Sequence, residues 1–421
     1  MTDALFAPFK KLLNRRIGVI MLLGFASGLP LELSGSTLKL WFADQGVDFT
    51  SIGLLSLLGM PYAFKALWAP VLDRYVPPFL GRRRGWMLIT QVAVALGLVA
   101  MAGSSPTLAP GTLAAFAVFV AFASASQDIV LDAYRTDVLH DRERGFGAAV
   151  FVSGYRVAML VAGAVSLIIA DELGWSVAYL TMAAMMGIGV VATLVAPPPE
   201  FAVVAPRTLA RAVIDPLVEL FTRPGALWLI LAVFLFKLGD AFAGSLFGPF
   251  LRRALGFTPG EIGVVMKTVG FASVMGGMLV GGLLMARLGL LRSLVVFGVL
   301  QAASNLVFMV LAEAGHDYGL MVTSVAVENV TGGMGTAAFV ALLMALCDHR
   351  YTATQYALLS AIAALGRIFI GPLAGMSVDP LGWTVFFAIS AIVAIPGIAI
   401  IVLLRRNIHA LERDPEPPSA A

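Results

Sequence analysis

The stretch AAFAVFVAFASASQDIVLDAYRTD, residues 114–137, joins a long apolar run to a strongly charged end. Its first part has the composition of a helix surrounded by hydrocarbon, whereas its end carries three aspartates and an arginine. At about 100° per residue in an α-helix, Asp128, Asp132 and Arg135 fall on one narrow stripe, and Asp137 falls on the opposite side. The stretch therefore predicts a membrane helix with one polar face.

The rest of the chain has the same apolar character. Of its 421 residues, 59% are hydrophobic and 13% are charged, and the mean hydropathy is +0.92. A soluble domain carries about a quarter charged residues. Apolar runs of about twenty residues recur along the chain, and each is sufficient to cross roughly 30 Å of hydrocarbon. The composition predicts an all-α polytopic membrane protein.

Simple counts exclude other classes of protein. The single cysteine, Cys347, leaves no internal disulfide. The net charge of +3 comes from basic residues in separate short loops, which does not indicate nucleic-acid binding. Lys10 and Lys11 precede an apolar run that is too long for a cleaved signal sequence, so we expect a retained first helix. We expect no cofactor and no metal, and we expect a monomer.

Twelve spanning helices are predicted in two sets of six. The first set covers 17–41, 51–72, 86–104, 110–134, 146–170 and 175–196, and the second covers 226–251, 261–286, 293–312, 319–346, 354–377 and 383–404. Between the sets, the part from Thr208 to Phe221 is expected to form an amphipathic surface helix. The predicted domains are an N-terminal six-helix bundle (1–196), a cytoplasmic linker (197–224), a C-terminal six-helix bundle (225–407) and a cytoplasmic tail (408–421).

Basic residues set the orientation of these helices. Of the 28 lysines and arginines, six lie inside the spans, twenty lie in segments on one side, and only Arg252 and Arg253 lie on the other side. Cytoplasmic loops of membrane proteins carry the excess of lysine and arginine. The distribution predicts that both termini lie in the cytoplasm.

The two sets of helices repeat each other in sequence. Four pairs of identical residues stand 211 residues apart: Phe25 with Phe236, Gly28 with Gly239, Asp137 with Asp348, and Arg156 with Arg367. A parallel repeat of six helices resembles the build of the major facilitator superfamily, whose halves are related by an axis along the membrane normal. That resemblance implies two six-helix bundles and transport by alternating access.

Charged residues inside the spans follow the same arrangement. The third, sixth, ninth and twelfth helices carry none, which fits the peripheral helices of that superfamily. Each such charge costs about 2.5–3.5 kcal/mol at a helix centre, or roughly 25–35 kcal/mol for ten unpaired charges. They must pair with one another, as neighbours three apart on a helix can, or line a polar route. The ten that are expected to be buried are Glu32, Lys65, Asp128, Asp132, Arg156, Lys237, Asp240, Lys267, Glu328 and Arg367.

Two glycine-rich stretches lie beside these charged residues, GFASGLP at 24–30 and ENVTGGMG at 328–335. Small residues permit close helix packing, and they also permit a break in a helix beside a substrate. Both explanations stay open at this point.

An enzymatic alternative rests on QDIVLDAYRTD, residues 127–137. This stretch resembles the aspartate-rich motif of intramembrane prenyltransferases, in which spaced carboxylates hold Mg²⁺ against a diphosphate. Those enzymes carry a second aspartate motif in a later helix pair. The corresponding stretch here, ENVTGGMGTAAFVALLMALCD at 328–348, has no such motif. The repeat is also unexplained by this alternative.

A set of motifs spread along nearly the whole chain resembles the AmpG muropeptide permeases, a branch of the major facilitator superfamily. They are GFASGLP, LDRYVPPFLGRRRGW, SASQDIVLDAYRTDVL, GYR, FKLGDAFA, KTVG, ENVTGGMGTAAFVALLMALC and ATQYALLSAIAALGR. Glu32 and Lys39 lie where that family is expected to be uncharged, so the resemblance gives them no role.

The resemblance implies a function. Such permeases are not enzymes. They import N-acetylglucosamine–1,6-anhydro-N-acetylmuramic acid, with or without its peptide, across the bacterial inner membrane for peptidoglycan recycling. Import is coupled to protons, and in some bacteria the imported fragments govern β-lactamase induction. The competing prediction is a major facilitator transporter of another amphipathic solute, such as a drug or acyl-CoA.

The resemblance also implies a cytoplasmic latch. In the superfamily, an aspartate at the end of the second helix pairs with a loop arginine and a neighbouring helix end, and so holds one gate conformation. Asp73 matches that aspartate in DRYVPPFLGRRR, residues 73–84, although VPPFL changes the usual spacing. Simple positive-inside anchoring is the alternative. The predicted gating residues are Asp73, Arg74, Arg82, Arg83, Asp137 and Asp348.

A proton-driven importer needs a carboxyl group that takes up a proton outside and releases it inside. An exposed aspartate titrates at about 3.9, which is too acidic. Burial and a neighbouring carboxylate both disfavour the charged form. Asp128 has both features available, with Asp132 one turn away and Arg135 placed to keep Asp132 ionised. We predict Asp128 as the proton carrier, followed by Glu328, with Asp132 and Asp240 as further candidates.

Substrate recognition is expected to depend on basic residues. Muropeptide stem peptides carry carboxylates, which bind most strongly to charged hydrogen-bond donors. The predicted substrate-binding residues are Gln127, Lys65, Arg156, Lys237, Lys267, Asn329 and Arg367. Lys267 and Arg367 are favoured for contact with the anionic peptide.

Overall fold

The computed structural model describes residues 15–139, 144–198, 218–222, 225–347 and 352–412, which contain helices and no strand. Eleven stretches of these residues are long and apolar enough to cross a membrane. One of them, Leu358–Leu403, holds two helices that meet at Gly382. The φ of 74° at Gly382 ends the first of the two helices. The described residues thus contain the twelve spanning helices that the sequence predicts.

The chain forms two compact units, and each is described by itself. Unit 1 takes the described residues within 1–47, 58–206 and 258–263, and unit 2 takes those within 48–57, 207–257 and 264–421. Most of the predicted linker, 199–217 and 223–224, lies outside the described residues, and so does the gating candidate Asp348. The predicted domain boundaries therefore stay a prediction.

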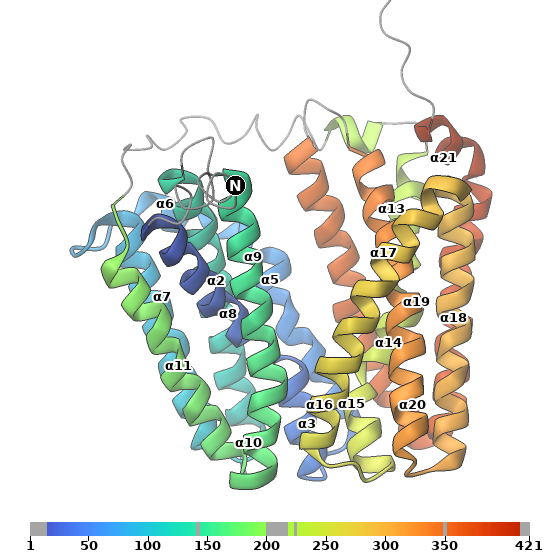
Figure 1. Ribbon diagram of the computed structural model, residues 1–421, viewed down its shortest axis with the longest axis horizontal. Coiled ribbons are helices and arrows are strands. Elements are labelled where there is room, and N and C mark those ends of the chain that lie inside the picture. Colours follow the sequence, from blue (N-terminus) through green and yellow to red (C-terminus); the bar gives the residue numbers. More distant parts are fainter. Residues whose placement is uncertain (1–14, 140–143, 199–217, 223–224, 348–351, 413–421) are drawn as a thin grey trace, which may run out of the picture. The chain divides into compact units, whose positions relative to one another are not determined.

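The described residues of unit 1 form nine α-helices, which Figure 1 labels. They are α2 (Arg15–Ser34), α3 (Ser36–Asp44), α5 (Met60–Phe64), α6 (Ala69–Arg74), α7 (Gly81–Ala102), α8 (Pro110–Val138), α9 (Arg144–Leu160), α10 (Ser166–Leu173) and α11 (Trp175–Val195). A π-helical segment, Val161–Val165, joins α9 to α10. The first turn of α16 (Pro259–Val265) also belongs to this unit.

Two helices expected to be continuous are interrupted. The first spanning helix breaks at Gly35, between α2 and α3, where φ is −107° and ψ is −110°. The second is divided by 3₁₀-helical segments, Leu55–Gly59 and Lys65–Leu67. Pro61 and Pro70 follow these irregular turns and lack the amide proton that a helix interior needs. The interruptions place Lys65 in a segment with non-α geometry.

Glycines explain the close packing of α2 on α9. A Cβ atom on Gly24 would overlap the carbonyl oxygen of Phe151, and one on Gly28 would overlap that of Tyr155. In return, a Cβ on Gly154 would overlap the carbonyl oxygen of Met21. Small residues let membrane helices approach backbone to backbone. The glycines of GFASGLP thus serve helix packing.

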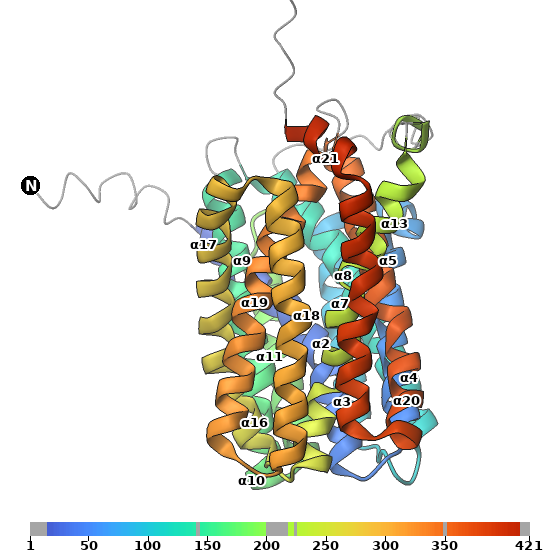
Figure 2. The ribbon, with the colours of Figure 1, turned by 90° about the vertical axis from the view of Figure 1, so that its right-hand side faces the viewer.

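Unit 2 contains α4 (Phe49–Leu54), α13 (Ala226–Phe236), α14 (Leu238–Ser245), α15 (Phe247–Pro249), the end of α16, α17 (Phe271–Leu288), α18 (Leu290–Ala314), α19 (Tyr318–Ala345), α20 (Thr352–Leu403) and α21 (Arg405–Glu412). Two π-helical segments, Phe250–Ala254 and Met266–Gly270, interrupt its spanning helices. In Figure 2, α17 and α18 flank α19, and both contact it. Gly277 and Gly333 let α17 and α19 touch, because a Cβ on either would overlap the facing backbone.

Helix α4 packs on α20 within unit 2. The ring of Phe49 meets that of Trp383 edge to face, with centroids 5.0 Å apart, and the guanidinium of Arg253 lies 4.6 Å from its centre. Gly53 approaches α20 so closely that a Cβ atom would lie 2.6 Å from the carbonyl oxygen of Gly371. This segment of the second spanning helix is therefore anchored by both aromatic and small residues.

Asp48 caps the N-terminus of α4. Its Oδ1 accepts a hydrogen bond of 2.7 Å from the backbone N–H of Ser51. Slight burial raises the pKa of Asp48, but the hydrogen bond from Ser51 and the charge of Arg253 outweigh it and hold the pKa below its ordinary value of 3.8. Asp48 therefore caps the helix as a carboxylate.

Candidate functional site

Asp128 stands at the centre of a polar cluster in unit 1. Its Oδ1 accepts a hydrogen bond of 2.6 Å from the Ser27 hydroxyl on α2. Its Oδ2 lies 3.8 Å from Nζ of Lys65, which sits in the 3₁₀-helical segment after α5. Three separate elements thus converge on one carboxyl group, whose side chain is 18% exposed. The predicted proton carrier and a predicted substrate-binding lysine are in contact.

Gln127 and Ser126 hold α8 in place beside this cluster. Nε2 of Gln127 donates to the carbonyl oxygen of Ala26 at 3.0 Å, and Oε1 of Gln127 is buried with no hydrogen-bond partner among the described residues. Nε1 of Trp68 donates to the Ser126 hydroxyl at 3.0 Å. A buried amide oxygen that lacks a donor is costly. Gln127 therefore holds an unsatisfied hydrogen-bond acceptor in the interior of unit 1, next to Asp128 in the chain.

Asp132 has a separate partner one turn further along α8. Its Oδ1 lies 3.2 Å from Nη2 of Arg135, and the guanidinium of Arg135 also stacks 4.6 Å from the ring centre of Phe151. The predicted pairing of Asp132 with Arg135 is confirmed. Because Asp128 and Asp132 each contact a basic side chain, their geometry favours ion pairs over the shared Mg²⁺ of the enzymatic alternative.

Arg83 joins two aspartates at the end of unit 1 where α6, α7 and α8 meet. Its Nη1 lies 2.6 Å from Oδ1 of Asp73, and its Nε lies 2.7 Å from Oδ2 of Asp137. Nη1 of Arg82 donates to the backbone carbonyl of Asp73 at 3.2 Å, whereas Arg74 is exposed. Four of the predicted latch residues, Asp73, Arg82, Arg83 and Asp137, thus lie together, whereas Asp348 lies outside the described residues.

The turn before α7 allows this contact despite the inserted VPPFL. Leu80 has a φ of 56° and Gly81 a φ of 74°, so the chain reverses through two left-handed residues. This conformation is rare for leucine. Helix α7 then starts at Gly81 rather than at the expected residue 86, and its first turn carries the arginines. Arg84 donates to the carbonyl oxygens of Thr193 and Leu194, which end α11.

A second polar cluster lies in unit 2 around Lys237. This lysine occupies the break between α13 and α14, with a φ of −100° and a ψ of 8°. Its Nζ lies 3.4 Å from Oδ2 of Asp240 and donates to Oε1 of Gln301 at 3.1 Å. The pairing of Lys237 with Asp240 that the sequence allowed is therefore present, and Gln301 on α18 completes it.

Glu328 on α19 belongs to the same cluster. Its carboxyl group lies within electrostatic reach of both Lys237 and Asp240. A Cβ atom on Gly335 would lie 2.6 Å from Oε1 of Gln301, so the glycines of ENVTGGMG also make room for this cluster.

The other predicted substrate-binding residues lie elsewhere. Asn329 donates from Nδ2 to the backbone carbonyl of Val325 on its own helix at 2.9 Å. Lys267 is half-buried in the π-helical segment Met266–Gly270, and Arg156 and Arg367 are exposed. These four residues are not part of the contacts around Asp128 or Lys237 described above.

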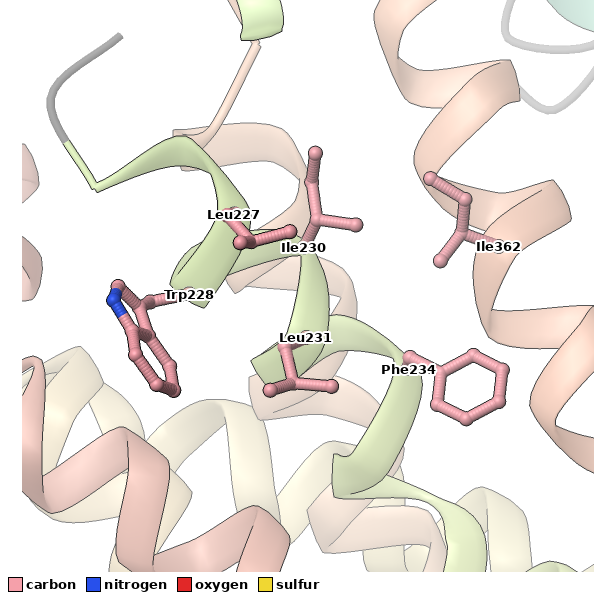
Figure 3. Close-up of a pocket in the computed structure, with 6 residues that line it drawn as sticks. All are labelled: Leu227, Trp228, Ile230, Leu231, Phe234 and Ile362. Atoms are coloured by element: carbon pink, nitrogen blue, oxygen red, sulfur yellow. The ribbon is translucent and has the colours of Figure 1, made fainter.

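An apolar pocket of about 290 Å³ lies between α13 and α20 in unit 2. Figure 3 shows the side chains that line it, which are Leu227, Trp228, Ile230, Leu231, Phe234 and Ile362. The pocket includes none of the charged candidates. A polar solute would find few hydrogen-bond partners there, so the charged clusters remain the candidate site.

Sequence reasoning missed several residues of the two clusters. Ser27 and Gln301 were not candidates, although both contact candidates directly. Ser27 stands within GFASGLP, and the spacing of Gly24 and Gly28 would have indicated a packed helix face beside it. Gln301 is a polar residue in the ninth helix, where an apolar residue would be expected. Its polarity could have identified it as a member of the cluster.

Comparison with known proteins shows to which family the chain belongs. The model of the Major Facilitator Superfamily matches residues 20–239 and 229–420. The chain is 48% identical over 395 residues to the anhydromuropeptide permease of Escherichia coli K12, covering 94% of this chain and 80% of that protein. It is 30% identical over 404 residues to the putative transporter AmpG 4 of Rickettsia conorii, covering 94% of this chain and 97% of that protein.

Solved structures show the same fold. A peptide transporter POT in complex with sulfate superposes with a TM-score of 0.73 at 12% identity, covering 94% of this chain and 95% of that one. A bacterial homologue of the human lysosomal transporter Spinster gives 0.69 at 14% identity, with 96% and 98% covered. On the match to the family model and the 48% identity to the E. coli permease, the chain belongs to the Major Facilitator Superfamily and, within it, to the anhydromuropeptide permeases.

Proposed function

We propose that this protein imports anhydro-muropeptides across the bacterial inner membrane in symport with protons. The substrate is N-acetylglucosamine–1,6-anhydro-N-acetylmuramic acid, with or without its peptide, and import serves peptidoglycan recycling. The observation that carries the proposal is the 48% identity to the anhydromuropeptide permease of E. coli over 94% of this chain. The protein acts as a monomer and moves its solute without changing a covalent bond.

The pair of Asp128 and Lys65 supports a coupling mechanism. When Asp128 takes up a proton, its carboxyl group becomes neutral and Lys65, 3.8 Å away, loses its counter-ion. An uncompensated ammonium group in a membrane protein attracts an anion strongly. A carboxylate of the stem peptide then binds Lys65, so that proton and substrate load together. Release of the proton to the cytoplasm restores the ion pair and expels the substrate.

Further residues complete the proposed site. Lys237 is balanced by Asp240 and lies near Glu328, which is the second candidate for proton exchange. Lys267, Arg156 and Arg367 supply additional positive charge for an anionic peptide. The amides Gln127 and Asn329 supply hydrogen bonds to uncharged parts of the ligand.

The contacts of Arg83 with Asp73 and Asp137 support a gating role for this end of unit 1. Arg82 and Arg74 flank the pair, and Asp348 is the proposed counterpart of Asp137 in the second half. An ion network at helix ends holds one conformation until another replaces it. We place these residues on the cytoplasmic side, with both termini in the cytoplasm. Alkaline phosphatase fused after residue 206 or 421 should be inactive, and activity at either point would contradict this orientation.

Uptake by the purified protein in proteoliposomes tests the function. Radiolabelled anhydro-muropeptide should accumulate when the outside is more acidic than the inside, and collapse of the proton gradient should stop accumulation. Asp128→Asn should abolish accumulation and leave downhill exchange largely intact. Asp171→Asn, an exposed aspartate of α10, is the matched control. Full proton-driven accumulation by Asp128→Asn would remove Asp128 from the mechanism, and transport of drugs or acyl-CoA instead would favour the competing solute classes.

A further inference from the structure

Gln301 is a buried amide on α18, the ninth spanning helix, where the sequence predicts an apolar helix. The residue is 5% exposed. Burial of an amide is costly unless hydrogen bonds compensate it. The coupling mechanism above does not use Gln301, so the contacts of its side chain need an explanation of their own.

The amide of Gln301 has a defined orientation. Its Oε1 accepts a hydrogen bond of 3.1 Å from Nζ of Lys237. An ammonium group only donates hydrogen bonds, so the amide atom that faces it must be the oxygen. The Nε2 atom is buried with no hydrogen-bond partner among the described residues. The amide thus turns the negative end of its dipole towards the lysine.

Two glycines of α19 leave the room that this arrangement needs. A Cβ atom on Gly335 would lie 2.6 Å from Oε1 of Gln301 and 3.6 Å from Nζ of Lys237. A Cβ atom on Gly332 would lie 3.2 Å from Nε2 of Gln301 and 3.7 Å from Oε1 of Glu328. A side chain at residue 335 would therefore push the amide away from the lysine. The hydrogen bond between Gln301 and Lys237 depends on the close packing of α18 on α19.

Lys237 contacts two acceptors of different charge. Oδ2 of Asp240 lies 3.4 Å from its Nζ, which is longer than the about 2.7–2.9 Å of a strong charge-assisted hydrogen bond. The oxygen of Gln301 is nearer but carries no net charge. An ammonium group has three N–H donors, so these two contacts leave one donor for a further acceptor. The lysine is thus held in place by a contact that does not neutralise it, beside a long ion pair.

The first half of the chain has a similar amide with an uncharged partner. Gln91 lies on α7, the third spanning helix, 210 residues before Gln301. It is fully buried, and its Oε1 accepts a hydrogen bond of 2.8 Å from the Thr193 hydroxyl. The residue that stands 211 positions before Lys237 is Ala26, which has no charge. The lysine distinguishes the two sites, so Gln91 supplies a matched control for Gln301.

We propose that Gln301 is a positioning residue for solute recognition, which holds the ammonium group of Lys237 with a neutral oxygen and so keeps it able to bind a carboxylate of the solute. The inference rests on the proposed import of anhydro-muropeptides, whose stem peptides are anionic. A carboxylate in place of the amide would complete the neutralisation of the lysine. An apolar side chain would leave the ammonium group to Asp240 alone.

Binding of labelled ligands to the purified protein in detergent tests this role. Gln301→Glu keeps the shape of the side chain and adds a negative charge beside Lys237. It should weaken binding of the tripeptide ligand by about tenfold or more, because a hydrogen bond to a charged group is lost. Binding of the peptide-free disaccharide, which carries fewer carboxylates, should weaken less. Gln301→Met removes the acceptor at similar size and should have the same effects in smaller measure.

A charge exchange separates positioning from a structural role. Gln301→Glu combined with Asp240→Asn again gives Lys237 one carboxylate and one neutral oxygen. This double variant should bind the tripeptide ligand to within about threefold of the wild type, whereas two independent defects in the fold would add. In a Lys237→Gln background, Gln301→Met should cause no further loss of binding, because the residue through which it acts is absent.

Gln91→Met removes a buried amide from α7 and should leave the ratio of the two affinities unchanged. The inference is overturned if both Gln301 variants bind the tripeptide ligand as the wild type does, if they lose both ligands equally, or if the charge exchange does not restore binding. Should Gln301→Glu fail to fold, Gln301→Met alone and in the Lys237→Gln background decides. A wild-type protein that binds neither ligand would instead refute the proposed function, and this inference with it.

Discussion

Arg83 forms ion pairs with Asp73 and Asp137, and the contributions of these two pairs to stability can be compared. Its guanidinium contacts Asp137 at 2.7 Å and Asp73 at 2.6 Å, so distance alone does not distinguish the two contacts. Exposure does. The side chains of Arg83 and Asp137 are 10% and 9% exposed, whereas that of Asp73 is 43% exposed. The perturbation is to replace each aspartate by asparagine, which removes the charge and keeps the shape.

The structure predicts different energies for the two changes. Removing one partner of a buried ion pair leaves an uncompensated charge and costs about 3–5 kcal/mol. An exposed pair contributes about 0–1 kcal/mol, because water and salt screen it. Replacing Asp73 leaves Arg83 with its buried partner Asp137, whereas replacing Asp137 leaves it only the exposed Asp73, which water and salt screen. We therefore expect Asp137→Asn to lower the free energy of unfolding by about 3 kcal/mol, and Asp73→Asn to lower it by less than about 1 kcal/mol.

Equilibrium unfolding of the purified protein in mixed detergent micelles measures both values. Asp132→Asn is a suitable reference, because Asp132 is exposed and its contact with Arg135 lies within one helix. Raising the salt concentration should reduce the effect of Asp73→Asn more than that of Asp137→Asn. The reasoning is refuted if Asp73→Asn destabilises the protein as much as Asp137→Asn does.

Three further predictions address packing, recognition and pH. Gly28→Val should prevent folding, because its Cβ would overlap the facing backbone. Gly18→Val on the same helix should be tolerated, because a Cβ there meets nothing within 4 Å. Size-exclusion profiles of the two purified variants compare them. Lys267→Gln and Arg367→Gln should weaken uptake of the tripeptide ligand more than that of the disaccharide, and equal losses would indicate a structural role. The lowered pKa of Asp48 makes its contribution to stability complete above pH 3.8 and lost as the pH falls through the lowered value; unfolding of Asp48→Asn should lack this acid dependence.

The fold and the pairs within one helix could be predicted from the sequence, whereas the pairs between helices could not. Asp132 with Arg135 and Lys237 with Asp240 follow from helix geometry, because residues three apart share a face. Lys65 meets Asp128 only because the second spanning helix turns through 3₁₀ geometry at that point. Periodicity carries no information on such a contact.

The interruptions of the helices show the same limit. Residues 51–72 read as one apolar run, and hydropathy cannot distinguish α, 3₁₀ and π geometry. Pro61 and Gly35 were visible signals, but proline and glycine are tolerated within membrane helices when neighbours satisfy the backbone. The hydrogen bond from Ser36 to Glu32 could not be predicted either, because the two residues lie on opposite sides of the break at Gly35.

The contact of α2 with α9 has a mechanical consequence. At Gly24 and Gly28 the two helix backbones touch directly. No side chain separates them there that could change rotamer and so let one helix slide along the other. Moving one helix along the other by a single residue, about 1.5 Å, would drive a methyl or larger group into a carbonyl oxygen. Helices α2 and α9 are therefore expected to move together as one rigid body. During a transport cycle, bending is left to the interrupted segments Leu55–Gly59 and Lys65–Leu67, whose 3₁₀ geometry lacks the regular hydrogen bonds of an α-helix.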